Sequence, residues 1–233
     1  MKTILLILSI ALTGAHFTRA QEPTEAPSAG FLNIVNLITL KSPTYIELGS
    51  FALNGGEPVK AGDSSGVLAI KPGSYPFTLS NAAAKPAKVT GEFTMEADRT
   101  VAIICYDEVK QYRDGSEEVK LRYTVLVESD LTGPRLSLVS LLREPLAGLE
   151  VSGDPVTLTP RQAHQRKVAL EDEIRIEYGG KTLAEFAIER PVHYLGFLFE
   201  NIEPGEVGIS LIENEKLEYQ PPLETGDGDE ERE

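Results

Sequence analysis

Short apolar runs separated by turn-forming residues recur along the first half of the chain. Several alternate apolar and polar residues, as a half-buried strand does, while residues 101–106 are apolar almost throughout. Runs of this length, divided by Gly, Pro, Asn and Asp, are typical of an all-β sandwich or barrel. The strands that we expect cover residues 31–40, 45–48, 67–71, 75–80, 89–95, 101–106 and 119–128.

Two further features of the pattern concern connections. Pro72, Gly73 and Ser74 stand between two expected strands and predict a hairpin turn that joins them. Residues 160–167 form a modest helical candidate, and the same residues also suit a loop. The pattern therefore predicts a protein built almost entirely of strands and turns.

The second half of the chain repeats the pattern of the first half. Repetition in the same order predicts two tandem β-domains, although any two β-sandwiches can share such patterns by chance. We expect domain 1 over residues 31–130 and domain 2 over residues 134–220. The similar segments are residues 32–37 and 136–141, 45–50 and 149–154, 90–106 and 183–199, and 123–128 and 208–213.

The two ends of the chain lack this strand pattern. Residues 1–20 begin with Lys2, continue with an apolar run and end on Ala20, which is the layout of a secretory signal peptide cleaved after Ala20. The run is about half the roughly 20 residues of a membrane-spanning helix, so we expect no span after cleavage. Residues 21–30 predict a flexible leader, and residues 221–233 predict a disordered acidic tail.

The net charge and the cysteine content restrict the cellular compartment and the classes of partner that we expect. Removing the first 20 residues changes the formal net charge from −14 to −16, because it takes away Lys2 and Arg19. A chain of this charge is repelled by phosphate backbones, so we expect no nucleic-acid partner. Cys105 is the only cysteine in the sequence, which excludes an intramolecular disulfide and favours a bacterial periplasm or cell surface over a eukaryotic secreted protein.

One segment of the first half carries a family resemblance. Residues 67–79 hold an apolar strand, a Pro-Gly-x-Tyr turn and a second strand, and they lie between residues 33–36 and residues 101–106. With these segments, residues 31–129 resemble a widespread family of bacterial exported Ig-like or prealbumin-like domains of unknown function, often found as tandem copies behind a signal peptide. The resemblance implies an all-β protein of two tandem Ig-like β-sandwich domains, and it supplies no catalytic residues.

The clearest candidate for chemistry is a serine loop. Gly62, Ser64 and Gly66 match the Gly-x-Ser-x-Gly pattern of a hydrolase nucleophile elbow, and the loop resembles the serine loop of trypsin-like proteases. An elbow needs a helix after the serine, and here the pattern predicts a strand. His164 and His193 both follow Ser64, and no pattern places either beside it. We therefore expect a surface turn, with a serine hydrolase using Ser64 as the alternative.

Histidine and cysteine favour structural roles. His164 and His193 lie 29 residues apart with no cysteine beside them, which makes a poor zinc pair. Cys105 alternates onto the same face as Val101 and Ile103, so we expect it in the core. The sequence predicts no metal site and no cofactor.

Clusters of carboxylates are the remaining candidates. Residues 227–230 carry oxygen ligands suited to calcium but lack the full calcium loop, so a cation-dependent adhesin is a second alternative. The acids at 171–173 and 117–118 are adjacent in sequence, so on strands they point to opposite faces and suit solvated edges better than acid–base chemistry.

These patterns favour a binding function over a catalytic one. We expect an exported, non-enzymatic binding or structural module of the bacterial envelope, located in the periplasm or at the cell surface. Its expected partner is a protein that contacts exposed strand edges.

Overall fold

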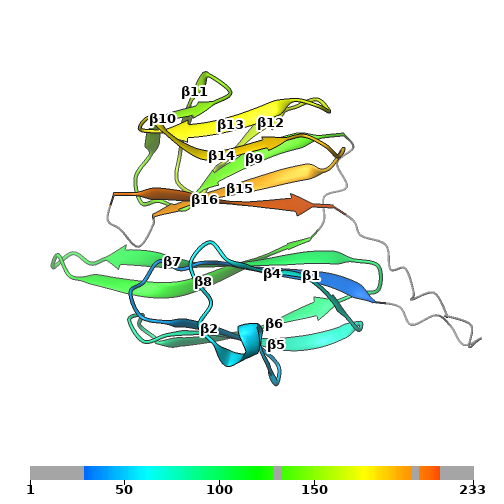
Figure 1. Ribbon diagram of the computed structural model, residues 1–233. Coiled ribbons are helices and arrows are strands. Elements are labelled where there is room, and N and C mark those ends of the chain that lie inside the picture. The colour runs from blue at the N-terminus through cyan, green and yellow to red at the C-terminus, as the bar shows by residue number, and fades with distance from the viewer. Residues whose placement is uncertain (1–28, 128–132, 201–204, 216–233) are drawn as a thin grey trace, which may run out of the picture.

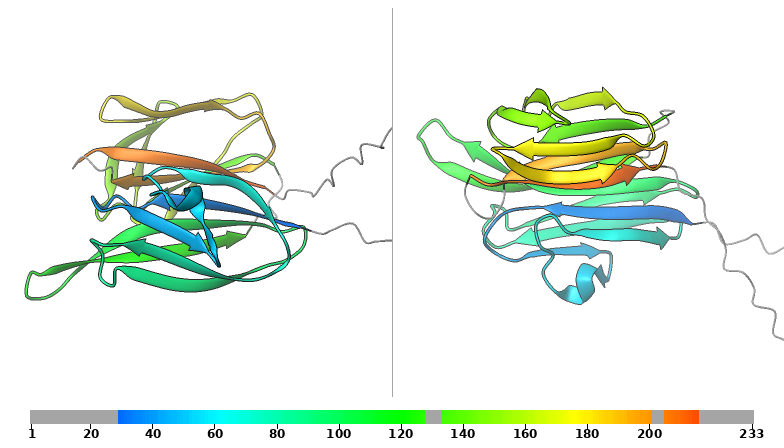
Figure 2. Two further views of the ribbon diagram at one scale, coloured as in Figure 1. Left: turned by 60° about the horizontal axis from the view of Figure 1, so that its bottom comes forward. Right: turned by 45° about the horizontal axis from the view of Figure 1, so that its top comes forward.

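The computed structural model describes residues 29–127, 133–200 and 205–215. Within these residues, all regular structure except one short 3-10 turn is β-strand, which confirms the all-β prediction. The strands form four sheets of four strands each. Figure 1 shows the sheets stacked in four layers, with the earlier half of the chain in the lower two layers, and Figure 2 shows the same stack from two further directions.

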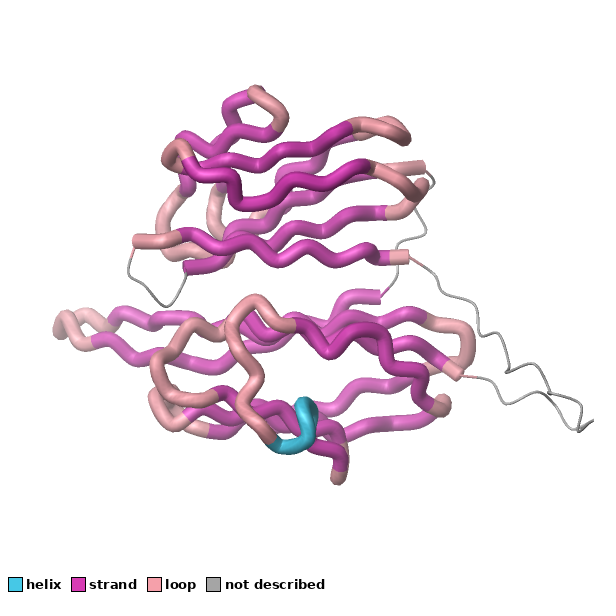
Figure 3. Tube along the Cα trace, in the orientation of Figure 1, coloured by secondary structure: helices cyan, strands magenta, loops and turns pink. Residues whose placement is uncertain are grey.

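The lower two layers contain residues 30–127. Their strands are β1 (Gly30–Leu37), β2 (Thr44–Leu48), β3 (Phe51–Ala52), β4 (Ser64–Ile70), β5 (Gly73–Asn81), β6 (Lys88–Met95), β7 (Thr100–Gln111) and β8 (Glu117–Val127). The 3-10 turn (Leu53–Gly56), cyan in Figure 3, follows β3. Sheet A has the order β4-β1-β7-β8, and sheet B has the order β3-β2-β5-β6. β1 and β7 run parallel, whereas the other neighbours are antiparallel.

The upper two layers repeat this arrangement. Their strands are β9 (Arg135–Ser140), β10 (Leu146–Val151), β11 (Asp154–Leu158), β12 (Ala163–Lys167), β13 (Glu173–Tyr178), β14 (Lys181–Ala187), β15 (His193–Glu200) and β16 (Val207–Asn214). Sheet C has the order β12-β9-β15-β16, and sheet D has the order β11-β10-β13-β14. β9 and β15 run parallel, as β1 and β7 do. The four pairs of similar segments in the sequence lie on equivalent strands of the two halves.

Each pair of sheets encloses an apolar core. Between sheets A and B, Leu32, Phe77 and Ile103 are almost fully buried, and the rings of Phe77 and Tyr123 meet edge to face with centroids 5.2 Å apart. Between sheets C and D the corresponding core includes Leu138, Leu149, Ile176 and Leu198. Each half is therefore a β-sandwich.

A third apolar cluster lies between sheets A and C and joins the two sandwiches. Side chains alternate between the two faces of a strand, so β1, β7 and β15 bury apolar residues on both faces. This double burial explains why residues 101–106 are apolar almost throughout, as strands covered on both faces usually are. The buried members are Val35, Leu37, Ala102, Ile104, Leu195, Phe197, Phe199 and Ile212.

Two predicted connections are wrong. Residues 163–167 form β12, an edge strand that pairs with β9, because ladder hydrogen bonds outweigh the weak helix preference of so short a segment. The predicted turn at residues 72–74 does not close a hairpin: Gly73 and Ser74 already belong to β5, and β4 pairs with β1 in sheet A whereas β5 pairs with β2 and β6 in sheet B. Turn residues favour a change of direction, but they do not decide which sheet the next strand joins.

The expected signal peptide (residues 1–20) and acidic tail (residues 221–233) lie outside the described residues, as does the leader up to residue 28. Ala29 is buried and Gly30 opens β1, so the described strand begins one residue earlier than predicted. Within the described ranges, no helix is long and apolar enough to cross a membrane.

Removing a large side chain from the cluster between the sandwiches tests their packing. We expect Phe197→Ala to lower the free energy of unfolding by about 3 kcal/mol or more, because a buried ring is replaced by a cavity. The control Val125→Ala, at a side chain that is 38% exposed, should change it by about 0.5 kcal/mol or less. Urea unfolding measures both, and equal effects would contradict the packing of sheet C on sheet A.

Candidate functional site

Three cavities lined by described residues open between sheets A and C, beside the apolar cluster, and the two with the larger volumes adjoin each other. The first, here called the charged cleft, has a volume of about 480 Å³, and the second, here called the apolar cavity, about 490 Å³. Tyr106, Leu141 and Arg161 line both, so the two spaces adjoin. Cavities of this size at the interface between structural units are the usual place for a ligand. The region between the sandwiches is therefore the candidate site.

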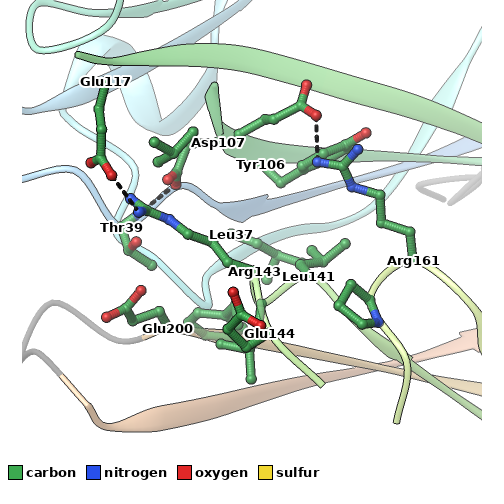
Figure 4. Close-up of a pocket in the computed structure, with 15 residues that line it drawn as sticks. Leu37, Thr39, Tyr106, Asp107, Glu117, Leu141, Arg143, Glu144, Arg161 and Glu200 are labelled. Atoms are coloured by element: carbon green, nitrogen blue, oxygen red, sulfur yellow. Dashed lines mark hydrogen bonds and ion pairs between the residues drawn. The ribbon is translucent and has the colours of Figure 1, made fainter. Parts of the chain in front are cut away.

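The charged cleft takes its walls from both sandwiches. The first sandwich supplies the ends of β1, β7 and β8, and the second supplies the segments after β9, before β12 and at the end of β15. Figure 4 shows Arg143 directed toward Glu117 and Asp107, with Arg161 lying beside Tyr106. Acids outnumber bases among the described residues that line it, with Asp107, Glu108, Glu117, Glu144 and Glu200 against Arg143 and Arg161.

Ion pairs cross the charged cleft from one sandwich to the other. Arg143 Nη1 lies 3.4 Å from Glu117 Oε1, and Arg161 Nη2 contacts Glu108 Oε1. Glu108 also accepts a hydrogen bond at 2.8 Å from Nε of Arg122, its neighbour on β8. The hydrogen bond from Arg122, followed by that from Arg161, lowers the pKa of Glu108, so this carboxylate stays ionised at neutral pH.

Asp107 is the half-buried acid of the charged cleft. Its Oδ1 accepts a hydrogen bond of 2.9 Å from the backbone N–H of Thr39. Burial raises the pKa of Asp107, and the negative charge of Glu200 adds to the increase, while the bond from Thr39 and the charge of Arg143 oppose it. A cationic group placed between Asp107 and Glu200 would relieve this repulsion. The charged cleft is thus suited to a positively charged ligand.

The apolar cavity has one polar end. Ser137 Oγ and His193 Nε2 are 2.7 Å apart there, on the neighbouring strands β9 and β15. Burial, together with the charge of Arg135, lowers the pKa of His193 and favours its neutral form. The Nδ1 atom of His193 is buried without a hydrogen-bond partner among the described residues. In catalytic Ser–His pairs a third group usually orients the imidazole, and no described residue does so here.

Sequence reasoning missed this serine–histidine pair. The sequence pattern offers His193 as a zinc ligand or as a partner of Ser64, and Ser137 lies in a repeated strand segment with no catalytic motif. The two residues meet because β9 and β15 pair in parallel, and no local pattern predicts which strands pair.

The loop around Ser64 is packed against the second sandwich. Ser64 begins β4, so a strand follows it where an elbow requires a helix. Its hydroxyl accepts a hydrogen bond of 3.3 Å from the backbone N–H of Gly66. Gly62 has a φ of +89°, and a Cβ there would lie 3.6 Å from Cζ of Phe199. The glycine thus permits a tight turn beside Phe199, which gives the motif a structural explanation.

The remaining predicted residues are dispersed. Cys105 is fully buried between sheets A and B, as predicted, and burial raises the pKa of its thiol. His164 lies exposed on β12, and the described residues contain no group of three or more His, Cys, Asp or Glu side chains arranged to hold a metal ion.

The paired carboxylates also lie apart. Residues 171–173 are exposed at the start of β13. On β8, Glu117 contacts Arg143, whereas Glu118 Oε2 lies 3.3 Å from Lys120 Nζ. The acids at 227–230 lie outside the described residues.

Comparison of the chain with protein-family models and with curated proteins finds no match. The function must therefore be argued from the geometry and electrostatics of the site.

The crossing ion pairs predict a pH dependence of stability. Because the pKa of Glu108 is lowered in the folded protein, its contribution is present above the unfolded-chain pKa of about 4.3 and is lost as pH falls through the folded value. Glu108→Gln should therefore lower the free energy of unfolding by about 1 kcal/mol at neutral pH.

Urea unfolding at several pH values checks this expectation. The gap between wild type and Glu108→Gln should be present above about pH 4.3 and should close as the pH falls further. Glu150→Gln, at an exposed carboxylate on β10, is the matched control and should show no gap. A gap for Glu108→Gln that persists at acid pH would contradict the electrostatic origin.

Labelling with a serine-directed phosphonate tests the loop at Ser64. We expect wild type and Ser64→Ala to show the same background labelling, because the loop lacks the helix that activates an elbow serine. Stoichiometric labelling that disappears in Ser64→Ala would contradict this. The variant Ser137→Ala serves as the control for reactivity at the serine–histidine pair.

Proposed function

We propose that this chain is an exported, non-enzymatic binding module of the bacterial envelope, made of two tandem β-sandwich domains of the Ig-like or prealbumin-like type. The layout of residues 1–20 supports export, and the repeated strand order supports a tandem pair. An Ig constant domain has the sheets ABED and CFG. Here the first strand instead pairs in parallel with the seventh, which favours the prealbumin-like description.

The observation that carries the proposal is the acidic excess in a cleft built by both sandwiches. Asp107 and Glu200 repel one another there, while Glu108 and Glu117 are already paired with arginines. A chain segment can reach the cleft from solvent, because five of its lining residues are exposed: Glu117, Arg143, Glu144, Arg161 and Glu200. These features favour a protein partner that inserts a Lys or Arg side chain between Asp107 and Glu200.

The edge of sheet A offers the same partner a second contact. β8 is an edge strand that borders the charged cleft at Glu117, and farther along it Val125 and Val127 are 38% and 45% exposed. An extended segment can pair with such an edge through main-chain hydrogen bonds while one side chain enters a pocket. We therefore propose an extended, basic protein segment as the ligand.

Site-specific photocrosslinking tests this function. A benzophenone amino acid at position 144, on the rim of the charged cleft, should give a discrete protein adduct in envelope preparations. The same amino acid at position 150, on sheet D, should give none. The double variant Asp107→Asn/Glu200→Gln should reduce the adduct about tenfold, because it removes both unbalanced charges.

Control variants test whether the crosslink depends on the acids of the charged cleft. Glu150→Gln/Glu185→Gln removes two exposed charges from sheet D and should leave the adduct unchanged. Equal adducts from positions 144 and 150, or an adduct at 144 that is indifferent to Asp107 and Glu200, would contradict the proposal.

A further inference from the structure

The apolar cavity differs in character from the charged cleft beside it. We propose that it binds a small amphipathic carboxylate, with the apolar body of the ligand inside the cavity and the carboxylate at Arg161. This site is separate from the protein-binding role proposed for the charged cleft, and it does not depend on that role.

The walls of the apolar cavity suit a hydrocarbon body. Ile104 and Leu126 from sheet A face Val139, Leu195 and Phe197 from sheet C across it. Its volume of about 490 Å³ falls within the range of natural small-molecule sites. An apolar ligand would cover the partly exposed Leu126 and Val139, and it would add van der Waals contacts that the two sheets do not make with each other there.

The charged residues that line the apolar cavity indicate which charge its ligand should carry. Among the described residues that line the apolar cavity, none is an acid, and Arg161 is the one that is always ionised. His193 at the polar end is held near neutrality by burial and by Arg135. An anionic head group therefore meets an attractive charge at Arg161, whereas a cationic one meets repulsion.

Arg161 is held in place by an unusual backbone conformation. Its φ is +61°, in the left-handed region that non-glycine residues adopt rarely. Its N–H donates a 2.8 Å hydrogen bond to the carbonyl of Ser140, and the preceding Pro160 forms an isolated bridge with Ser140. This conformation and the bond to Ser140 fix the backbone of Arg161, a residue that lines both the cavity and the cleft.

The carboxylate of a ligand can bind Arg161 without leaving Glu108 unpaired. Glu108 is held by Arg122 as well as by Arg161, so two guanidinium groups share one carboxylate. When Arg161 turns toward a ligand, Glu108 retains its 2.8 Å contact with Arg122. Arg161 can therefore form a charge-assisted hydrogen bond to the ligand while Glu108 keeps a cationic partner.

Isothermal titration with three ten-carbon probes tests the site. Decanoate, decan-1-ol and decylammonium share one hydrocarbon body and differ in head-group charge. We expect decanoate to bind the full chain at least about tenfold more tightly than the alcohol, and decylammonium to bind most weakly. Equal affinities for the three probes, or no binding of decanoate, would overturn the proposal.

Two variants locate the bound probe. Arg161→Gly removes the guanidinium at a position whose backbone suits glycine, and it should weaken decanoate binding about tenfold while leaving the alcohol unchanged. Ala163→Phe, at an exposed position on β12 that lines the cavity, should fill the space and abolish binding of both. Decanoate affinity that is unchanged in both variants would overturn the assignment.

Two controls separate this site from the charged cleft. Arg143→Gln removes the other arginine that bridges the sandwiches, and it should leave decanoate affinity within about twofold. The adduct formed from position 144 should persist in Ala163→Phe. A loss of decanoate binding in Arg143→Gln as large as that in Arg161→Gly would overturn the role assigned to Arg161.

Discussion

The apolar cluster between sheets A and C is the contact on which the whole arrangement depends, because it turns two sandwiches into one four-layered stack. Each sandwich has its own core, yet β1, β7 and β15 also present apolar side chains on their outer faces. Burying those faces against each other removes a large apolar surface from water. The relative placement of the two halves, and everything built at their junction, follows from this contact.

Repetition of the strand order explains how the junction is made. The central strands of sheet A and of sheet C are equivalent, so each sandwich offers the same kind of doubly apolar sheet to the other. The sheets meet closely at Val35, Ile104 and Phe197, and the two cavities open beside these contacts. Apolar packing thus fixes the two sheets together, and the cavities lie where that packing ends.

Polar and charged side chains at the junction make the charged cleft and the apolar cavity chemically different. The arginines at 143 and 161 come from the second sandwich and meet glutamates on the long β7–β8 pair of the first. Acids are in excess along the charged cleft, whereas Arg161 is the one always-charged residue among the described residues that line the apolar cavity. Arg161 therefore lies between a space suited to cations and a space suited to an amphipathic anion.

The local sequence pattern predicts the strands and the burial of Cys105, because alternation of apolar and polar residues and turn preferences depend only on residues close together in the chain. The pattern is wrong at residues 163–167, where pairing with β9 outweighs the local helix preference. It is also wrong at residues 72–74, where the chain passes from sheet A to sheet B.

The sequence by itself determined the strand content, the repeat and the apolar run at 101–106, since each depends on residues close together in the chain. The tertiary structure alone decided which strands pair, that sheets A and C face each other, and that Ser137 meets His193. It also decided that Arg161 stands between the two cavities. The contacts of Ser137 with His193 and of Arg161 with Glu108 join residues 56 and 53 positions apart, and no local pattern encodes such contacts.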